Sequence, residues 1–440
     1  MNNTVKIPVV RKELLFPFIA ITSLFALWGI ANDLTNPMVS AFKKVMPELS
    51  NVQASLVQFA FYFGYFFMAL PAALFIRKYS YKSGIILGLL LYATGAFLFF
   101  PAAQFQEYNY FLLSLWIITC GLAFLETISN PLILSLGDQE TATQRLNLAQ
   151  AFNPMGSISG MIMAQVFVMS ALRSDDYTTE AFNALSSDEL ALIRENDLGV
   201  ISLPYIGLGV IVLIVMTVIL FTRIPKTHDN LKMTLSDSFK KLFANKNYVR
   251  GVIAQAFYVG AQIMCWTYIF QYVDNLNESL GLDLTATYFN IAAMVSFLVS
   301  RWIGTALMMR INPSRLLMYF GTGGALCCAG AIFLPGMAGL FSLVAISIFM
   351  SIMFPTIYGI ALKNMGDEAK IGSAGLVMAI VGGALMPILQ GSILDLGGTG
   401  FSDIKLFGYI PEVNFSFILP LICLAVVAHY GYTTYKQSKI

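Results

Sequence analysis

Long apolar segments recur along the whole 440-residue sequence, and each is long enough to cross a lipid bilayer. Hydrophobic residues make up 57% of the chain and charged residues only 11%, whereas an average soluble domain has roughly 25% charged residues. Because one aqueous core cannot enclose so much apolar surface, the sequence predicts an all-α membrane protein. We predict twelve transmembrane helices, over residues 15–38, 53–76, 83–102, 109–135, 146–171, 201–222, 250–273, 286–309, 315–334, 338–362, 372–394 and 414–435.

Lysine and arginine are divided unevenly between the loops that join these helices. When the loops are assigned alternately to the two sides of the membrane, 20 basic residues fall on the side of both termini and five on the other. Because basic loops stay in the cytoplasm, both termini are predicted to be cytoplasmic.

A polar, basic segment at residues 223–249 divides the chain into two halves of six predicted helices each, residues 1–222 and 250–440. Matching positions in the halves are similar: ALPAALFIRKYSYKSGIILGL in the first and FLVSRWIGTALMMRINPSRLL in the second both end a helix in a basic turn. On this interpretation Arg301 belongs to the basic turn. Two parallel six-helix halves are typical of the major facilitator fold, whose substrate site lies at mid-membrane between them.

Two acidic residues, Asp33 and Glu126, lie well inside predicted spans. A charged carboxyl at the bilayer centre costs at least about 2.5 kcal/mol, so each is expected to face a cavity or a partner. Asn130 lies one turn after Glu126, and Pro131 interrupts the helical hydrogen bonds there. Because an apolar setting opposes ionisation, Glu126 is expected to gain and lose a proton near neutral pH. The structural alternative is a protonated carboxyl that only joins two helices.

Amide and aromatic side chains with helical spacing occur in three of the predicted spans. They are Trp28, Asn32 and Asn36 around Asp33, Gln150 and Asn153 in the fifth span, and Gln255, Tyr258, Gln262 and Trp266 in the seventh. Amides can bond sugar hydroxyls, and aromatic rings can cover the apolar face of a sugar ring. A charged substrate would instead call for a buried Arg or Lys. The pattern therefore predicts a neutral sugar as substrate, with interhelical amide hydrogen bonds as the structural alternative.

Other functional classes find little support in the sequence. Its five cysteines lie in apolar segments and its two histidines have no ligand neighbours, so we expect no metal and no cofactor. The net charge of +2 gives no sign of nucleic-acid binding. Because the sequence shows no catalytic triad and no nucleotide-binding motif, we predict that the protein is not an enzyme.

The sequence resembles the L-fucose:proton symporter (fucose permease) family of the major facilitator superfamily over almost its whole length. The segments that carry this resemblance are LFALWGIANDLTNP, SLVQFAFYFGYF, FIRKYSYKSGIILGL, FLETISNP, RLNLAQAFNPMGS, AQAFYVGAQIMCWTYI, FMSIMFPTIYGIALKNMG and GGALMPILQG. The resemblance implies symport of a 6-deoxyhexose with a proton, Glu126 as the proton carrier, and Gln150 and Asn153 in the lining of the sugar cavity. It also implies a bacterial inner membrane as location.

Two positions depart from the family pattern. Relatives place the acid of the first span one helical turn later, at the position of Asn36, whereas this chain has it at Asp33. Phe354 stands where relatives can carry Tyr, which removes a hydroxyl partner for the sugar. We therefore expect Asp33 either to bind sugar hydroxyls in a water-filled cavity or to share a proton with Glu126.

Taken together, these features predict a monomeric transporter in the lipid bilayer that moves L-fucose inward with a proton by rocking of its two halves. One alternative keeps the fold and changes the cargo to glucose or galactose, with sodium as the coupling ion held by oxygens of Asp33, Asn32 and Asn36. An alternative from another class is a sugar sensor that does not transport.

Overall fold

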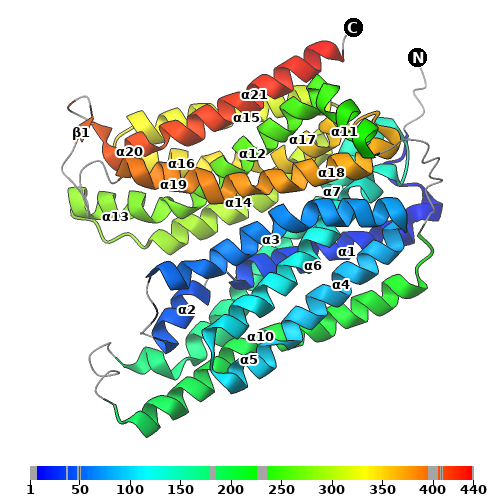
Figure 1. Cartoon of the computed structure of the whole chain (residues 1–440). Coiled ribbons are helices and arrows are strands. Elements are labelled where there is room, and N and C mark those ends of the chain that lie inside the picture. The colour runs from blue at the N-terminus through cyan, green and yellow to red at the C-terminus, as the bar shows by residue number, and fades with distance from the viewer. Residues whose placement is uncertain are drawn as a thin grey trace. The chain divides into compact units, whose positions relative to one another are not determined.

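The computed structural model describes residues 7–35, 38–46, 49, 51–177, 185–224, 235–394, 405–406, 408 and 410–438. These residues contain 12 helical segments that are long and apolar enough to cross a bilayer, which confirms the predicted number. The segments are Lys12–Thr35, Ala60–Lys78, Tyr81–Phe105, Tyr108–Ser135, Gln139–Ala171, Asp188–Phe221, Lys246–Leu280, Ala286–Leu307, Pro313–Phe333, Gly336–Ala361, Ala369–Leu394 and Glu412–Gln437. The protein is thus an integral membrane protein built from α-helices (Figure 1).

Several spans consist of successive helices rather than one continuous rod. From the N-terminus the α-helices are α1 (Leu15–Thr35), α2 (Met38–Val45), α3 (Asn51–Lys78), α4 (Tyr81–Phe97), α5 (Phe99–Phe105), α6 (Tyr108–Ser135), α7 (Ala142–Gln150), α8 (Phe152–Met163), α10 (Ser187–Phe221) and α11 (Leu235–Ala244). They continue with α12 (Lys246–Thr267), α13 (Ile269–Leu280), α14 (Ala286–Leu307), α15 (Pro313–Phe333), α16 (Gly336–Met350), α17 (Met353–Ala361), α18 (Ala369–Met378), α19 (Gly382–Leu394), α20 (Glu412–Ser416) and α21 (Ile418–Gln437).

Short segments complete the secondary structure of the described residues. They are the 3-10 turns η1 (Lys12–Leu14), η2 (Gln139–Thr141), η4 (Met169–Ala171), η5 (Arg173–Asp176), η6 (Gly366–Glu368) and η7 (Ala379–Val381), the π segment η3 (Ala164–Val168), and the strands β1 (Lys405–Leu406) and β2 (Ile410–Pro411). The two strands pair antiparallel, with Leu406 opposite Ile410.

The chain divides into two compact units. What we call the N-terminal unit comprises Lys12–Leu132 and Phe152–His228, and the C-terminal unit comprises Met1–Arg11, Ile133–Ala151 and Asp229–Ile440. Helix α7 therefore groups with the later helices, although it precedes residue 222 in the chain. The predicted boundaries of the two sequence halves and of the linker stay predictions.

Helix pairing repeats from one unit to the other. In the N-terminal unit α1 packs on α8 and α4 packs on α10, which pairs the first span with the fifth and the third with the sixth. In the C-terminal unit α12 packs on α19 and α15 on α21, which pairs the seventh span with the eleventh and the ninth with the twelfth. The same pairing in two sets of six spans is what a parallel internal repeat produces.

Glycines allow the backbones of these pairs to approach closely. A Cβ atom at Gly29 of α1 would collide with the carbonyl oxygen of Asn153 in α8, and one at Gly156 would collide with that of Ala26. In the C-terminal unit a Cβ at Gly382 of α19 would collide with the carbonyl oxygen of Ala256 in α12. Small residues at helix contacts are the usual solution in membranes, where no hydrophobic effect drives helices together.

The sixth span departs from its prediction. Its helix α10 starts at Ser187 instead of residue 201, with Ser186 and Glu189 forming a capping box. The segment between the fifth and sixth predicted spans is thus partly helical. The buried carboxylate of Asp197 accepts hydrogen bonds from the backbone N–H groups of Arg173 and Ser174, both at 2.9 Å, and so holds η5 against α10.

Candidate substrate and proton site

Close packing of α1 and α8 positions the first group of predicted site residues. The side chain of Asn153 donates a hydrogen bond from Nδ2 to the carbonyl oxygen of Phe25 at 3.2 Å. The Phe25 ring lies 4.5 Å from that of Trp28, which is only 2% exposed. Asn153 thus ties α8 to α1, while its Oδ1 atom can still accept a hydrogen bond.

Both intramembrane acids lie beside tyrosines of α3. Asp33 is 8% exposed and is close enough to Tyr62 for an electrostatic interaction. Glu126 of α6 is half-buried and interacts electrostatically with Tyr65. Tyr65 also interacts with Trp28. A phenol can both donate to and accept from a carboxyl, so each tyrosine can accompany its acid through a change of protonation.

The interior of α6 is polar around the proline predicted to interrupt it. Pro131 lies inside the helix, and buried Asn130 donates from Nδ2 to the carbonyl oxygen of Glu126 at 2.9 Å. The hydroxyls of Thr127 and Ser129 are buried and make no hydrogen bond in the structure. On α1 the Oδ1 atom of Asn32 is also buried without a hydrogen bond. Buried polar atoms of this kind are rare in proteins and indicate a place for water or a ligand.

The C-terminal unit carries a second polar group on α12. Gln255 is fully buried, and neither its Oε1 nor its Nε2 atom makes a hydrogen bond. One turn later the buried hydroxyl of Tyr258 makes none either. The Tyr258 ring lies edge-on to that of Phe354 in α17, with 6.3 Å between the ring centres. Two amide atoms and a phenol without partners form an arrangement suited to sugar hydroxyls.

Gln262 and Trp266 continue the same helix. Gln262 is half-buried. The indole N–H of Trp266 donates to the hydroxyl of Ser347 in α16 at 3.1 Å, and its ring lies edge-on to Phe297 at 5.2 Å. Trp266 therefore joins α12 to α16 and can offer a ligand only its ring face.

Arg301 differs from its sequence interpretation as part of a basic turn. It lies inside α14 with 3% of its surface exposed. Its guanidinium donates from Nε to the carbonyl oxygen of Ser351 and, at 3.0 Å, to that of Gln150. These carbonyls stand where α16 and α7 end, and negative helix C-termini favour a cation. The turn interpretation was wrong because the segment FLVSRWIGTALMMRINPSRLL by itself cannot distinguish an arginine near a helix end from one bound by other helices.

Further polar contacts hold α7 against α14 and α17 within the C-terminal unit. Asn147 donates from Nδ2 to the hydroxyl of Thr356 at 3.1 Å, and both residues are fully buried. Gln144 donates to the carbonyl oxygen of Thr305 at 3.4 Å. A Cβ at Gly359 would press on the side chain of Thr143. These contacts hold α7 within the C-terminal unit.

The structure therefore distributes the predicted site residues over two groups. Trp28, Asn32, Asp33, Glu126, Asn130 and Asn153 lie in the N-terminal unit, and Gln150, Gln255, Tyr258, Gln262, Trp266 and Phe354 lie in the C-terminal unit. Asn36 lies outside the described residues. Sequence reasoning missed Tyr62 and Tyr65, although their spacing of three in FYFGYF places them on one helix face.

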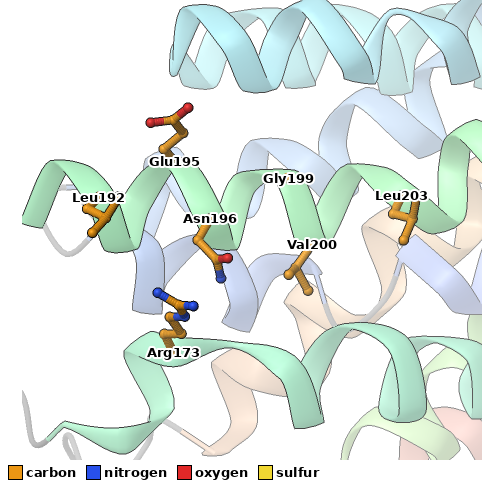
Figure 2. A pocket seen from close by; sticks show the side chains of 7 residues that line it. All are labelled: Arg173, Leu192, Glu195, Asn196, Gly199, Val200 and Leu203. Atoms are coloured by element: carbon orange, nitrogen blue, oxygen red, sulfur yellow. The ribbon is translucent and has the colours of Figure 1, made fainter.

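A surface depression of about 600 Å³ is lined by other residues of the N-terminal unit. Figure 2 shows Asn196 and Val200 pointing from α10 toward the segment that carries Arg173, with Glu195 on the other side of the helix. Leu192, Gly199 and Leu203 complete its lining. None of the predicted substrate or proton residues contributes to it.

Comparisons with known proteins agree with this architecture. The family model described as Major Facilitator Superfamily matches residues 15–390. The chain is 52% identical to the L-fucose-proton symporter of Haemophilus influenzae over 98% of its own length and 99% of that protein. It is 31% identical to a putative glucose/galactose transporter of Helicobacter pylori, over 96% of this chain and 97% of the relative.

A solved structure shows the same fold. The crystal structure of the major facilitator transporter FucP in the outward conformation superimposes with a TM-score of 0.84 and 34% sequence identity, covering 95% of this chain and 98% of that one. The chain thus has the fold and the relatives of transporters rather than of enzymes. It belongs to the fucose permease family of the major facilitator superfamily.

Proposed function

We propose that the protein takes up L-fucose together with a proton. The observation that carries this proposal is the 52% identity, over nearly the full length of both chains, to a protein named L-fucose-proton symporter. The relative named for glucose and galactose is much less similar, at 31%. Within this activity the substrate is a small neutral sugar, the coupling ion is a proton, and the protein acts as a monomer in the bilayer.

In this proposal Glu126 carries the proton. It is half-buried in the interior of α6, beside Tyr65 and next to the polar turn at Asn130 and Pro131. Protonation from outside removes a buried charge and so lowers the cost of closing the cavity around the sugar. Deprotonation toward the cytoplasm then favours release of the sugar.

The sugar-binding role falls to the polar atoms that the fold leaves without partners. Gln255 and Tyr258 offer three such atoms on α12, and Asn32 offers one on α1. A buried polar atom without a hydrogen bond costs about 1–3 kcal/mol, and sugar hydroxyls would relieve that cost. We propose that Asn130, Gln150, Asn153 and Gln262 add further contacts, and that Trp28, Trp266 and Phe354 cover the apolar ring face, as aromatic residues do in sugar sites.

Asp33 has a different role in this proposal from Glu126. Asp33 lies on α1 beside Tyr62 of α3, and its carboxylate can accept hydrogen bonds from sugar hydroxyls. The sodium alternative assigns the same oxygen atoms, with those of Asn32 and Asn36, to a cation. Dependence of uptake on sodium at fixed pH would favour that alternative.

Transport then requires the contact of α7 with α14 and α17 to open. The uneven distribution of lysine and arginine between the loops assigns the helix ends at this contact to the cytoplasm. Both termini are therefore proposed to be cytoplasmic, in a bacterial inner membrane. Opening would break the hydrogen bond between Asn147 and Thr356 and those that Arg301 makes to two backbone carbonyls. Alternating access by movement of one six-helix half against the other is the general mechanism of this fold.

The test uses purified protein in liposomes that contain a pH-sensitive dye. L-fucose, L-galactose, D-arabinose, glucose, galactose and lactose are added outside one at a time, with and without sodium. We expect the lumen to acidify when L-fucose is added without sodium, because sugar entry brings protons with it. Acidification only with glucose or galactose would overturn the substrate assignment, and sugar entry that needs sodium and leaves pH unchanged would overturn the coupling. Binding of the sugar without any entry would indicate a sensor.

A further inference from the structure

Helix α11 lies in the segment between the two sequence halves and is connected to a membrane span by a single residue. It ends at Ala244, and α12 begins at Lys246. The residue between them, Asn245, caps α12 by accepting hydrogen bonds at Oδ1 from the backbone N–H groups of Asn247 and Tyr248. Ten helical residues extend about 15 Å. Because a single residue joins the two helices, the C-terminal end of α11 lies next to the N-terminal end of α12.

One face of α11 is attached to the C-terminal unit (Figure 1). Leu242 is 2% exposed, and its side chain lies near Gly372 of α18. Lys241 forms an ion pair with Glu368 directly before α18, with Nζ and Oε1 2.6 Å apart. These two contacts fix the rotation of α11 about its own axis.

That rotation leaves an aromatic ring and one lysine exposed on α11, and a second lysine is exposed at the start of α12. Phe243 is 73% exposed, and Lys240, three residues earlier on the same face, is exposed as well. Lys246 is exposed at the start of α12. An aromatic side chain between lysines is typical of helices that lie in the interfacial layer of a bilayer. The charge sign also suits the cytoplasmic leaflet, where anionic lipids attract each nearby lysine by about 1 kcal/mol.

We propose that α11 docks on the headgroup layer of the predicted cytoplasmic leaflet. Phe243 inserts at the boundary between headgroups and acyl chains, and Lys240 and Lys246 bind the phosphate groups of anionic phospholipids. This docking anchors the segment between the two halves at the membrane surface during transport. It depends on the membrane topology and not on the identity of the sugar.

The depth of Phe243 can be measured with a nitroxide label on Phe243→Cys, in a background without the five native cysteines, in nanodiscs that contain phosphatidylglycerol. Collision rates with oxygen and with a water-soluble nickel complex report depth. References are Ser438→Cys, exposed at the end of α21, and Ile388→Cys, 65% exposed within the α19 span. We expect a ratio of oxygen to nickel collisions between the two references. A ratio equal to that of Ser438→Cys would overturn the proposal, and Ala244→Cys repeats the measurement if Phe243→Cys does not fold.

The lysines are tested by titrating short-chain phosphatidylglycerol into the protein in neutral detergent, with a fluorophore at position 244. We expect the affinity to fall about fivefold for each of Lys240→Gln and Lys246→Gln, from about 1 kcal/mol per lysine. The matched control is Lys436→Gln, which removes an exposed lysine of α21. The assignment of an anionic lipid would be overturned if Lys436→Gln lowered the affinity as much as the other two variants do. It would also be overturned if the protein bound phosphatidylcholine as tightly as phosphatidylglycerol.

Discussion

The pair α1 and α8 and the pair α12 and α19 are built alike but carry different chemistry. Both pairs approach through glycines, Gly29 and Gly156 in the first and Gly382 in the second. The first brings a carboxyl group, Asp33, into the membrane, with Glu126 on α6 in the same unit. The second carries Gln255 and Tyr258, uncharged groups without hydrogen-bond partners. The repeats therefore share their packing but differ in their polar side chains, and in the proposed mechanism Glu126 serves the proton while Gln255 and Tyr258 serve the sugar.

The largest expected effect tests the proton side of this comparison. Replacing Glu126 by Gln keeps the shape and removes the titrating group, so proton-driven accumulation of L-fucose should be lost completely while counterflow exchange continues. Both are measured with labelled sugar in liposomes. The control is Glu140→Gln, an exposed acid, which should accumulate sugar normally. Loss of counterflow in folded Glu126→Gln would show that Glu126 does more than carry a proton.

The next effect tests the sugar side. Gln255→Met fills the same volume without polar atoms, so L-fucose affinity should fall about ten- to hundredfold from loss of one or two hydrogen bonds. Because an amide without partners disappears, thermal stability should stay equal or rise. Gln390→Met is the matched control, since Gln390 is equally buried but donates to Ser416 at 2.9 Å. Its stability should fall. A stability loss in Gln255→Met as large as in the control would argue for a structural amide.

Equivalence of the two helix pairs can be tested through their glycines. Gly29→Ala and Gly382→Ala each place a Cβ against a backbone carbonyl, so each should destabilise its unit by about 1–3 kcal/mol. Gly207→Ala in α10 is the control, because nothing lies near its added Cβ, and it should be neutral or slightly stabilising. Thermal unfolding in detergent measures all three. Unequal losses for Gly29 and Gly382 would show that the repeats do not depend on equally close contact.

The smallest expected effect concerns the contact of α7 with α17. Thr356→Val removes the acceptor of Asn147 with little change of shape, which should cost about 1 kcal/mol. Hydrogen exchange of α7 amides should then become about fivefold faster. Thr217→Val, whose hydroxyl bonds only to Leu213 of its own helix, is the control. Unchanged exchange in Thr356→Val would show that α7 is held by other contacts, such as those of Arg301.

The class of fold, the number of spans and the two intramembrane acids can all be predicted from the amino-acid sequence. These follow from local properties, because hydrophobic length decides whether a segment spans the bilayer and a carboxyl inside it is rare. Helical spacing also predicts that Gln255 and Tyr258 share one face of a helix.

The contacts that those side chains make depend on tertiary packing. The structure showed that Trp266 donates to Ser347 while Gln255, on the same helix, has no partner. It placed Tyr62 and Tyr65 beside the acids. It also showed that Arg301 lies inside a helix and donates to backbone carbonyls at the ends of α7 and α16. A hydrogen bond such as that from Arg301 to Gln150, 151 positions apart in the chain, depends on how whole helices pack, and no local pattern encodes that packing.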